Sequence, residues 1–325
     1  MRCLCCNKDL NNPTEYEASV SWHSRCIKNF FGTKELPELD VTEKELEKLA
    51  NSTVSKGLTV PGVQKKLSLH LDREDKVDKL TIVDYPTGYI LKPPSNEYRA
   101  LPESEFLVMK MADAVGINVT PCALIKHEGE YSYITKRVDR LGIGSVKKGA
   151  VSLLAMEDFC QLSYRNTADK YKSSYENCAK VIGKFSKNVG LDQSELFYRL
   201  LFCFVIGNSD MHLKNFSLIE DAPGSREFGL SPAYDLLPVN VIMPADKEQM
   251  ALALNGKKRN IRRNDFLKMA ATIKLHDKTA SKLMDRIIGY EDVFKKMASE
   301  SYMPDDYKAS LENLISERVM ALKKN

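Results

Sequence analysis

The strongest constraint on the fold is a change in hydrophobic period partway along the chain. Between Leu58 and Thr135, apolar and polar residues alternate in short runs, of which KLSLHL (66–71) is the clearest. One helix interrupts these strands, from Pro102 to about Val115. After Asp139 the period becomes mostly helical, with a short β-rich interval at about 216–230. This order predicts an α+β protein of two lobes, with a strand-rich N-lobe and a mostly helical C-lobe.

The second part contains several helical runs of ordinary length. They are predicted at Met156–Ser163, Ala168–Asn188, Ser194–Ile206, Arg263–Ile273, Thr279–Ile288 and Asp306–Leu322. A shorter helix is predicted at Val41–Ala50, where Thr42 and Glu45 have the spacing of a capping box. The remaining strand candidates of the first part are LTIVD (80–84), GYILK (88–92), CALIK (122–126) and YSYIT (131–135).

Composition and charge exclude several classes of protein. Of the 325 residues, 43% are apolar and 28% are charged, which is ordinary for a globular protein, and the formal charge is only +4. This charge argues against bulk nucleic-acid binding, which needs a concentrated basic face. No apolar run approaches a membrane span, and the opening MRCLCCNKDL lacks the apolar core of a signal peptide. We therefore expect a cytoplasmic protein with no membrane partner.

Cysteines gather at the N-terminus, where Cys3 and Cys6 are followed, after sixteen residues, by the pair His23 and Cys26. Soft sulfur and imidazole ligands in a C-x2-C and H-x2-C arrangement predict a tetrahedral structural zinc site. Cys5 is then a spare thiol. The alternative is a metal-free terminus of reduced thiols, since disulfides are rare in the cytoplasm.

This cysteine module is expected to pack against the rest of the protein rather than on DNA, because it is weakly basic and is followed by Phe30 and Phe31. Three domains are predicted: a zinc-knuckle-like module (1–40), an N-lobe with a phosphate loop (41–138) and a helical C-lobe with a catalytic loop (139–325). The scattered cysteines are expected to be small buried hydrophobes; they are Cys122, Cys160, Cys178 and Cys203.

The segment GNSDMHLKNFSLI (207–219) carries the clearest chemistry. Gly207 ends a helical run, a polar cluster follows, and Phe216 opens a strand. Phosphoryl transfer needs a carboxylate that accepts the proton of the substrate hydroxyl and an oxygen ligand for magnesium nearby. Asp210 and Asn215 have the spacing of these two groups in kinase catalytic loops. Each residue alone is more typical of an ordinary loop.

A second acid, Asp235 in LSPAYDLLP (230–238), lies in an apolar frame just after the β-rich interval. Magnesium prefers carboxylate oxygens, so Asp235 is predicted to hold the metal with Asn215. In the first part, Lys92 ends an apolar strand, from which a lysine could reach ATP phosphates, and Glu105 on the following helix could orient it. A solvated strand end and a surface glutamate are the alternatives. The single-glycine loop TVPGVQKK (59–66) is not a Walker A motif and is weak by itself.

Taken in order, these stretches resemble the HipA-like serine/threonine kinases, the toxin half of a bacterial toxin–antitoxin pair. The stretches that carry the resemblance are VPGVQKKLSL, YILKPP, LPESEFLVMKMADAVGI, TKRVDR, EDFCQ, GNSDMHLKNFSLI and LSPAYDLLP. The resemblance implies a bilobal protein-kinase-like fold, with ATP and Mg²⁺ as cofactors. It also implies that Asp210 is the catalytic base and that His212 organises the catalytic loop.

The same resemblance implies a set of ATP contacts drawn from both lobes. They fall on Pro61, Gly62, Val63, Gln64, Lys65 and Lys66 of the loop, on Lys92, on Lys136, Arg137 and Val138 of the strand between the lobes, on His212, Leu213, Lys214 and Asn215, and on Tyr234 and Asp235. Thr59 stands where the best-studied members carry an autophosphorylated serine, so it is a candidate autophosphorylation site.

Partners are likewise implied by the resemblance. In the family the kinase phosphorylates an aminoacyl-tRNA synthetase, a helix-turn-helix antitoxin neutralises it, and DNA is met only through that antitoxin. This chain is similar to the shorter members, whose missing N-terminal subdomain can be a separate chain.

Two other functions stay open. The D-x-H-x-x-N pattern also occurs in small-molecule and lipid kinases, and a zinc-stapled DNA-binding or scaffold protein could carry an inactive kinase fold. The joint presence of Lys92, Asp210, Asn215 and Asp235 favours an active enzyme.

Overall fold

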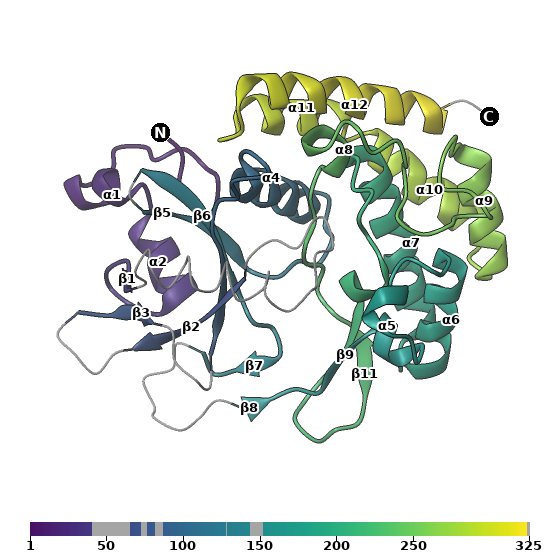
Figure 1. Ribbon diagram of the computed structural model, residues 1–325, viewed down its shortest axis with the longest axis horizontal. Helices are drawn as coiled ribbons and strands as arrows, with labels where there is room; N and C mark the ends of the chain where they lie inside the picture. Colours follow the sequence, from purple (N-terminus) through teal and green to yellow (C-terminus); the bar gives the residue numbers. More distant parts are fainter. Residues whose placement is uncertain (41–65, 73–76, 82–86, 128, 144–151, 324–325) are drawn as a thin grey trace. The chain divides into compact units, whose positions relative to one another are not determined.

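The computed structural model describes residues 1–40, 66–72, 77–81, 87–127, 129–143 and 152–323, which fall into two compact units (Figure 1). The N-terminal unit comprises Met1–Phe106 and Thr120–Ser152, and the C-terminal unit comprises Leu107–Val119 and Leu153–Asn325. The predicted helix at Val41–Ala50 and the predicted loop residues from Thr59 to Lys65 lie outside the described residues.

The N-terminal unit is built on a six-stranded sheet in the order β1-β3-β2-β4-β6-β5. Its β1 runs parallel to β3, and the other neighbours are antiparallel. The alternation expected in KLSLHL is confirmed, because Leu67, Leu69 and Leu71 are buried while Ser68 is exposed. The strands are β1 (Glu38–Asp40), β2 (Leu67–Asp72), β3 (Lys79–Thr81), β4 (Tyr89–Lys92), β5 (Cys122–His127) and β6 (Glu130–Lys136).

Helix α4 (Leu101–Ala114) is the helix expected among the strands. It ends before Gly116, which takes a left-handed φ of 86° that suits glycine. Its residues up to Phe106 belong to the N-terminal unit and the later ones to the C-terminal unit. A separate two-stranded sheet pairs β7 (Arg140–Leu141) with β8 (Ser152–Leu153).

The cysteine module contains two short helices, α1 (Glu15–Val20) and α2 (Ser24–Phe31), and it packs on the sheet of its own unit. Phe31 lies 5.4 Å from Tyr89 of β4, measured between ring centroids, and the Tyr89 hydroxyl donates to the Phe30 carbonyl at 3.4 Å. The backbone N–H of Leu124 on β5 donates to the carbonyl of Leu4 at 2.8 Å. The expectation that this module packs against the protein is therefore confirmed.

The C-terminal unit is arranged around α7 (Val189–Ile206), whose residues from Leu196 to Ile206 are all buried. A helix that is apolar on every face must be surrounded, and α7 packs against α6, α10 and α12. The surrounding elements are α5 (Phe159–Leu162), the 3₁₀ turn η1 (Thr167–Asp169), α6 (Tyr175–Phe185), the 3₁₀ turn η2 (Leu213–Asn215), α8 (Val239–Ile242), α9 (Arg263–Thr272), α10 (Asp277–Ile288), α11 (Glu291–Ser299) and α12 (Asp305–Lys323). A three-stranded sheet in the order β11-β10-β9 completes the unit, with β9 (Met156–Asp158), β10 (Ser217–Glu220) and β11 (Phe228–Leu230).

Three helix predictions were wrong in extent, and the helix predicted at Ser194–Ile206 is one of them, because α7 already begins at Val189. The run predicted as helix from Met156 begins as strand β9, because it pairs with β10, and only Phe159–Leu162 is helical. The run predicted from Ala168 becomes an α-helix only at Tyr175, because Ser174 is its cap and its hydroxyl accepts from a backbone N–H of the first turn. The helices α1, α2, α8 and α11 were not predicted.

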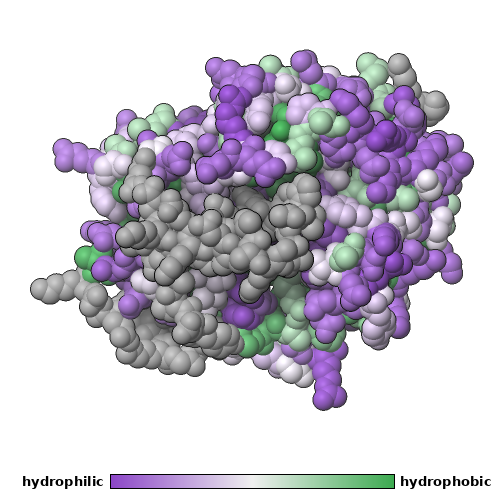
Figure 2. All heavy atoms as spheres, in the orientation of Figure 1, coloured by the Kyte–Doolittle hydropathy of each residue, from purple (hydrophilic) through white to green (hydrophobic). Residues whose placement is uncertain are grey.

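All four scattered cysteines are buried, as expected for small hydrophobic side chains; they are Cys122, Cys160, Cys178 and Cys203. Polar side chains cover much of the face of the C-terminal helices seen in Figure 2, with isolated apolar ones among them. Within the described residues, no helix combines the length and apolar character needed to cross a membrane.

Candidate active site

The segment 207–219 runs from the end of α7 through a polar loop into β10. Gly207 ends α7 in the left-handed region with φ 72°, and the N–H of Asn208 returns to the Cys203 carbonyl at 2.8 Å. A Cβ at Gly207 would collide with the Leu314 side chain of α12. Glycine is therefore favoured here by its backbone conformation, and a side chain would have to displace the end of Leu314.

Asp210 is held by its main chain and by one side-chain contact. Its N–H donates to the Asn208 side chain at 3.2 Å, and its carbonyl accepts from the Asn215 amide nitrogen at 2.9 Å. The hydroxyl of Tyr171, in the segment between η1 and α6, donates to Asp210 Oδ1 at 2.5 Å. The predicted pair of Asp210 and Asn215 thus lies together, with the Asn215 nitrogen engaged and its amide oxygen remaining as a ligand atom.

His212 is 5% exposed and lies between these residues. Burial lowers the pKa of His212, and the charges of Asp210 and Asp235 only partly oppose this effect. Its Nδ1 has no hydrogen-bond partner within the described part of the chain, and the Tyr171 ring meets the imidazole edge-on at 5.0 Å between centroids. A neutral ring packed in the loop agrees with an organising role.

Tyr234 and Asp235 follow β11. Asp235 has a φ of 55°, a left-handed conformation that is uncommon for a residue other than glycine and typical of functional loops. The Tyr234 hydroxyl lies 2.6 Å from Ser217 Oγ and donates to the Lys214 carbonyl at 3.1 Å. Burial raises the pKa of Tyr234. The Lys214 ammonium pairs with Asp158 at 2.7 Å, so the loop, β10 and the start of α5 are tied together.

Behind the loop, Asn240 of α8 connects it to the C-terminal helix. The Asn240 N–H donates to the Gly207 carbonyl at 3.0 Å, and its side-chain nitrogen donates to Ser209 Oγ at 3.3 Å. Ser209 donates in turn to Asp246 at 2.6 Å. Arg318 of α12 donates to the Asn240 side-chain oxygen at 3.2 Å. The backbone that carries Asp210 is therefore fixed from both ends.

In the N-terminal unit, Lys92 at the end of β4 forms an ion pair with Glu105 of α4. The Lys92 Nζ to Glu105 Oε1 distance is 2.5 Å, and the two side chains are 3% and 0% exposed. Lys92 also lies 5.2 Å from the centre of the Tyr133 ring. The ion pair proposed from the sequence is present, and the alternative of a surface glutamate is wrong.

The strand end predicted to meet ATP has its side chains engaged elsewhere. Lys136 donates to the Asn29 carbonyl at 3.3 Å, and burial lowers its pKa. Arg137 forms two hydrogen bonds with Asp139, at 2.9 and 3.1 Å. Val138 is half-buried, and Lys66 is exposed just before β2. Contacts of this strand with ATP stay a prediction.

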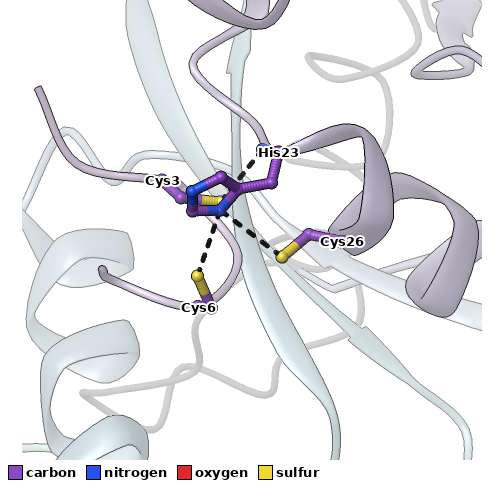
Figure 3. Close-up of side chains that lie close together, drawn as sticks. All are labelled: Cys3, Cys6, His23 and Cys26. Carbon is purple, nitrogen blue, oxygen red and sulfur yellow. Dashed lines mark hydrogen bonds between the residues drawn. The ribbon is translucent and has the colours of Figure 1, made fainter. Parts of the chain in front are cut away.

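The predicted metal ligands Cys3, Cys6, His23 and Cys26 converge in the cysteine module (Figure 3). Their ligand atoms all lie within 4.8 Å of one another, and His23 Nδ1 is 3.4 Å from Cys6 Sγ and 3.8 Å from Cys26 Sγ. A tetrahedral zinc with metal–sulfur bonds of about 2.3 Å needs ligand separations of roughly 3.8 Å. The cluster is thus compatible with zinc, and Cys5 is not among its members.

In this cluster, a negative charge on one thiolate disfavours ionisation of its neighbours. The hydrogen bond between Cys3 and Cys6 raises the pKa of Cys3 to about 12 and lowers that of Cys6 to about 7. Burial raises the pKa of Cys26. Three thiols at this separation become thiolates together only when a cation offsets their charge.

Three features of the site were not predicted from the sequence. They are Tyr171, Asp158 and the hydrogen bonds by which Asn240 joins the loop to α12. Tyr171 and Asp158 reach the loop from 39 and 56 residues away in the sequence. Only Asp158 had a usable signal, because Asp followed three residues later by Gln is a helix-start pattern.

Comparison with known proteins identifies a family for this chain. The HipA-like C-terminal domain matches residues 58–294. The Sinorhizobium fredii protein named "Putative kinase Y4dM" is 32% identical over 258 residues, which cover 73% of this chain and 60% of that protein. The Shewanella oneidensis "Serine/threonine-protein kinase toxin HipA" is 26% identical over 217 residues, 62% of this chain and 47% of the toxin.

A solved structure has a similar fold. The HipA chain in the Shewanella oneidensis complex of HipA, HipB and operator DNA matches with a TM-score of 0.68 at 20% identity, over 82% of this chain and 65% of that chain. The match spans only about half to two thirds of the length of each of these relatives. With its α+β kinase-like fold and a family match over most of its length, the chain belongs to the HipA-like C-terminal domain family.

Proposed function

We propose that this chain is an ATP- and magnesium-dependent kinase that transfers phosphate to a serine or threonine hydroxyl of a protein. The ion pair of Lys92 and Glu105 is the observation that carries the proposal. Removing two charges from water costs several kcal/mol per ion, so a fully buried pair is a poor device for stability alone. In protein kinases a strand lysine held by a helix glutamate contacts the nucleotide phosphates.

The residues of the C-terminal unit fit magnesium and ATP. Asn215 keeps its amide oxygen for a metal, because its nitrogen is bound to the Asp210 carbonyl, and Asp235 adds a carboxylate. Both are hard oxygen ligands of the kind magnesium prefers. Bound Mg-ATP would supply the phosphoryl group and the positive charge beside it.

The side chains then have distinct tasks. Asp210 accepts the proton of the substrate hydroxyl, and Asn215 and Asp235 hold the metal. Lys92 neutralises phosphate charge, and buried His212 keeps the loop in shape. The proposed ATP contacts at Lys66, Lys136–Val138, Leu213, Lys214 and Tyr234 complete the site, with Pro61–Lys65 outside the described residues.

Purified wild-type protein and Asp210→Ala, incubated with labelled ATP and a protein extract, test this function. We expect Asp210→Ala to slow transfer by about 10²–10⁴-fold, the usual contribution of a general base. Its affinity for a non-hydrolysable ATP analogue should be unchanged. Undiminished transfer by Asp210→Ala would contradict the assignment. Turnover with small molecules or lipid vesicles alone would favour the rival kinase class, and DNA retention without turnover would favour an inactive scaffold.

Substrate and partners are proposed from the family. The Shewanella structure contains HipB and operator DNA, so we expect a helix-turn-helix antitoxin here, with DNA contact only through it. The proposed substrate is a translation-related protein such as an aminoacyl-tRNA synthetase. Phosphopeptide mapping in cells expressing wild type or Asp210→Ala identifies the substrate and checks Thr59, and co-purification identifies the partners. Phosphate that appears equally in both cell lines would contradict the substrate assignment.

We also propose that Cys3, Cys6, His23 and Cys26 bind one structural zinc ion. Four protein ligands leave no open position, so this metal would hold the module on the sheet and take no part in catalysis.

A further inference from the structure

None of the roles proposed above explains the hydrogen bond between Tyr171 and Asp210. Tyr171 is neither a predicted nucleotide contact nor a metal ligand, yet its hydroxyl lies 2.5 Å from Oδ1 of the proposed catalytic base. We infer that Tyr171 is a positioning residue, which holds one carboxylate oxygen of Asp210 so that the other faces the substrate hydroxyl. This inference rests on the proposed kinase function.

The rest of Asp210 is already fixed through its backbone. Asn208 and Asn215 bind its N–H and its carbonyl, and the His212 N–H also donates to that carbonyl, at 2.8 Å. These bonds set where the Cα lies but leave rotation about the side-chain torsions. Within the described residues, the Tyr171 hydroxyl is the single recorded hydrogen-bond donor to the carboxylate. It therefore selects the rotamer.

Tyr171 is itself held in place. The backbone carbonyl of Lys170 accepts from the Leu213 N–H at 3.2 Å, which joins the segment before α6 to the turn that follows Asp210. Tyr175, four residues further on at the start of α6, donates to the Met211 carbonyl at 3.1 Å. The Tyr171 ring also packs edge-on against His212. A donor anchored at this many points can fix its acceptor.

The phenol is suited to donate rather than to ionise. Burial and, to a smaller extent, the negative charge of Asp210 raise the pKa of Tyr171. The hydroxyl therefore keeps its proton throughout the pH range in which the protein is folded. Asp210 is half-buried, and within the described residues no hydrogen bond reaches its second carboxylate oxygen. A strong donor makes a carboxylate less basic, but phosphoryl transfer depends more on the position of the nucleophile than on early proton removal. The gain in orientation outweighs the loss of basicity.

Two other roles for this contact make opposite predictions. A phenol that blocks the base would have to leave before the substrate binds, so its removal would raise activity. A phenol that is itself the phosphate acceptor would carry phosphate after incubation with Mg-ATP. A positioning residue does neither, and its loss lowers kcat with little effect on KM for ATP.

The experiment compares wild type, Tyr171→Phe, Asp210→Ala and the matched control Tyr198→Phe. Tyr198 is buried, whereas Tyr171 is half-buried, and the Tyr198 hydroxyl also donates a hydrogen bond, to the backbone carbonyl of Val115 at 3.2 Å, away from the catalytic loop. We expect Tyr171→Phe to lower kcat about 10–100-fold, as for loss of a hydrogen bond to a charged group, with KM for ATP changed less than about twofold. Tyr198→Phe should leave kcat within about twofold, because its bond reaches no reacting group.

A second readout reports on the hydrogen bond itself. A phenol in a short bond to a carboxylate gives a downfield proton signal in NMR spectra, which should vanish in both Tyr171→Phe and Asp210→Ala. A signal that survives in Asp210→Ala overturns the inference, as do an unchanged or raised kcat in Tyr171→Phe and phosphate on Tyr171. The two failures are distinguishable: an inactive wild type overturns both proposals, whereas full activity of Tyr171→Phe beside an inactive Asp210→Ala overturns only this one.

Discussion

In the N-terminal unit, the side chains of the proposed sites contact one another, whereas in the C-terminal unit most contacts hold the main chain of the loop. In the former, the ligand atoms of Cys3, Cys6, His23 and Cys26 lie within 4.8 Å of one another, and Lys92 forms an ion pair with Glu105. In the latter, the main chain of the loop around Asp210 is fixed by hydrogen bonds to backbone and side-chain groups and by the conformation of Gly207. The N-terminal groups should therefore be sensitive to loss of a partner side chain, and the loop to changes in backbone freedom.

Removal of a zinc ligand should have the largest effect. We expect Cys3→Ser or His23→Ala to abolish metal binding and to unfold residues 1–31 locally, because structural zinc contributes about 10 kcal/mol or more to small modules. Metal analysis and hydrogen exchange would show this, with exchange at 207–219 unchanged. Cys5→Ser is the control and should keep one zinc per chain. Equal hydrogen-exchange rates at residues 1–31 in His23→Ala and wild type would contradict the expected dependence of this module on its partner side chains.

The buried ion pair should come next. Glu105→Gln leaves the Lys92 ammonium buried beside a neutral amide, and we expect a loss of about 3–5 kcal/mol in unfolding free energy. The double variant Lys92→Met with Glu105→Leu replaces both charges and should regain most of that stability. Its phosphotransfer should stay absent. Urea unfolding and activity assays separate the two quantities; a double variant no more stable than Glu105→Gln would show that the pair is held by more than its mutual charge.

The smallest loss of stability is expected for a change in the backbone freedom of the loop itself. Gly207→Ala must hold alanine in the left-handed region and displace Leu314, which together should cost about 2–4 kcal/mol. Gly224→Ala is the matched control, because its φ of 75° is similar while a Cβ there meets nothing within 4 Å. It should cost only about 1–2 kcal/mol, for the left-handed conformation alone. Equal costs in thermal unfolding would mean that the contact with α12 adds nothing.

What the sequence could predict was set by how local each signal is. The alternation in β2, the end of α7 at Gly207 and the spacing of Asp210 and Asn215 depend on neighbours within a few residues, and all were visible. The four zinc ligands could be proposed because their spacing is itself a pattern. Tyr171 could not be found, because nothing near it in the sequence marks a partner 39 residues away. The parallel pairing of β1 with β3 is hidden for the same reason.

The bond between Leu124 and Leu4 has a consequence for synthesis on the ribosome. The cysteine module is synthesised early, but strand β5, whose Leu124 N–H binds the Leu4 carbonyl, is synthesised more than a hundred residues later. Until β4 and β5 are made, Phe30 and Phe31 lack the Tyr89 ring that they contact in the finished unit. If the ligands capture zinc early, the metal would keep these side chains folded together and guard the thiols against oxidation during the wait. Supply of metal during translation, rather than the stability of the finished protein, would then limit the yield of folded chain.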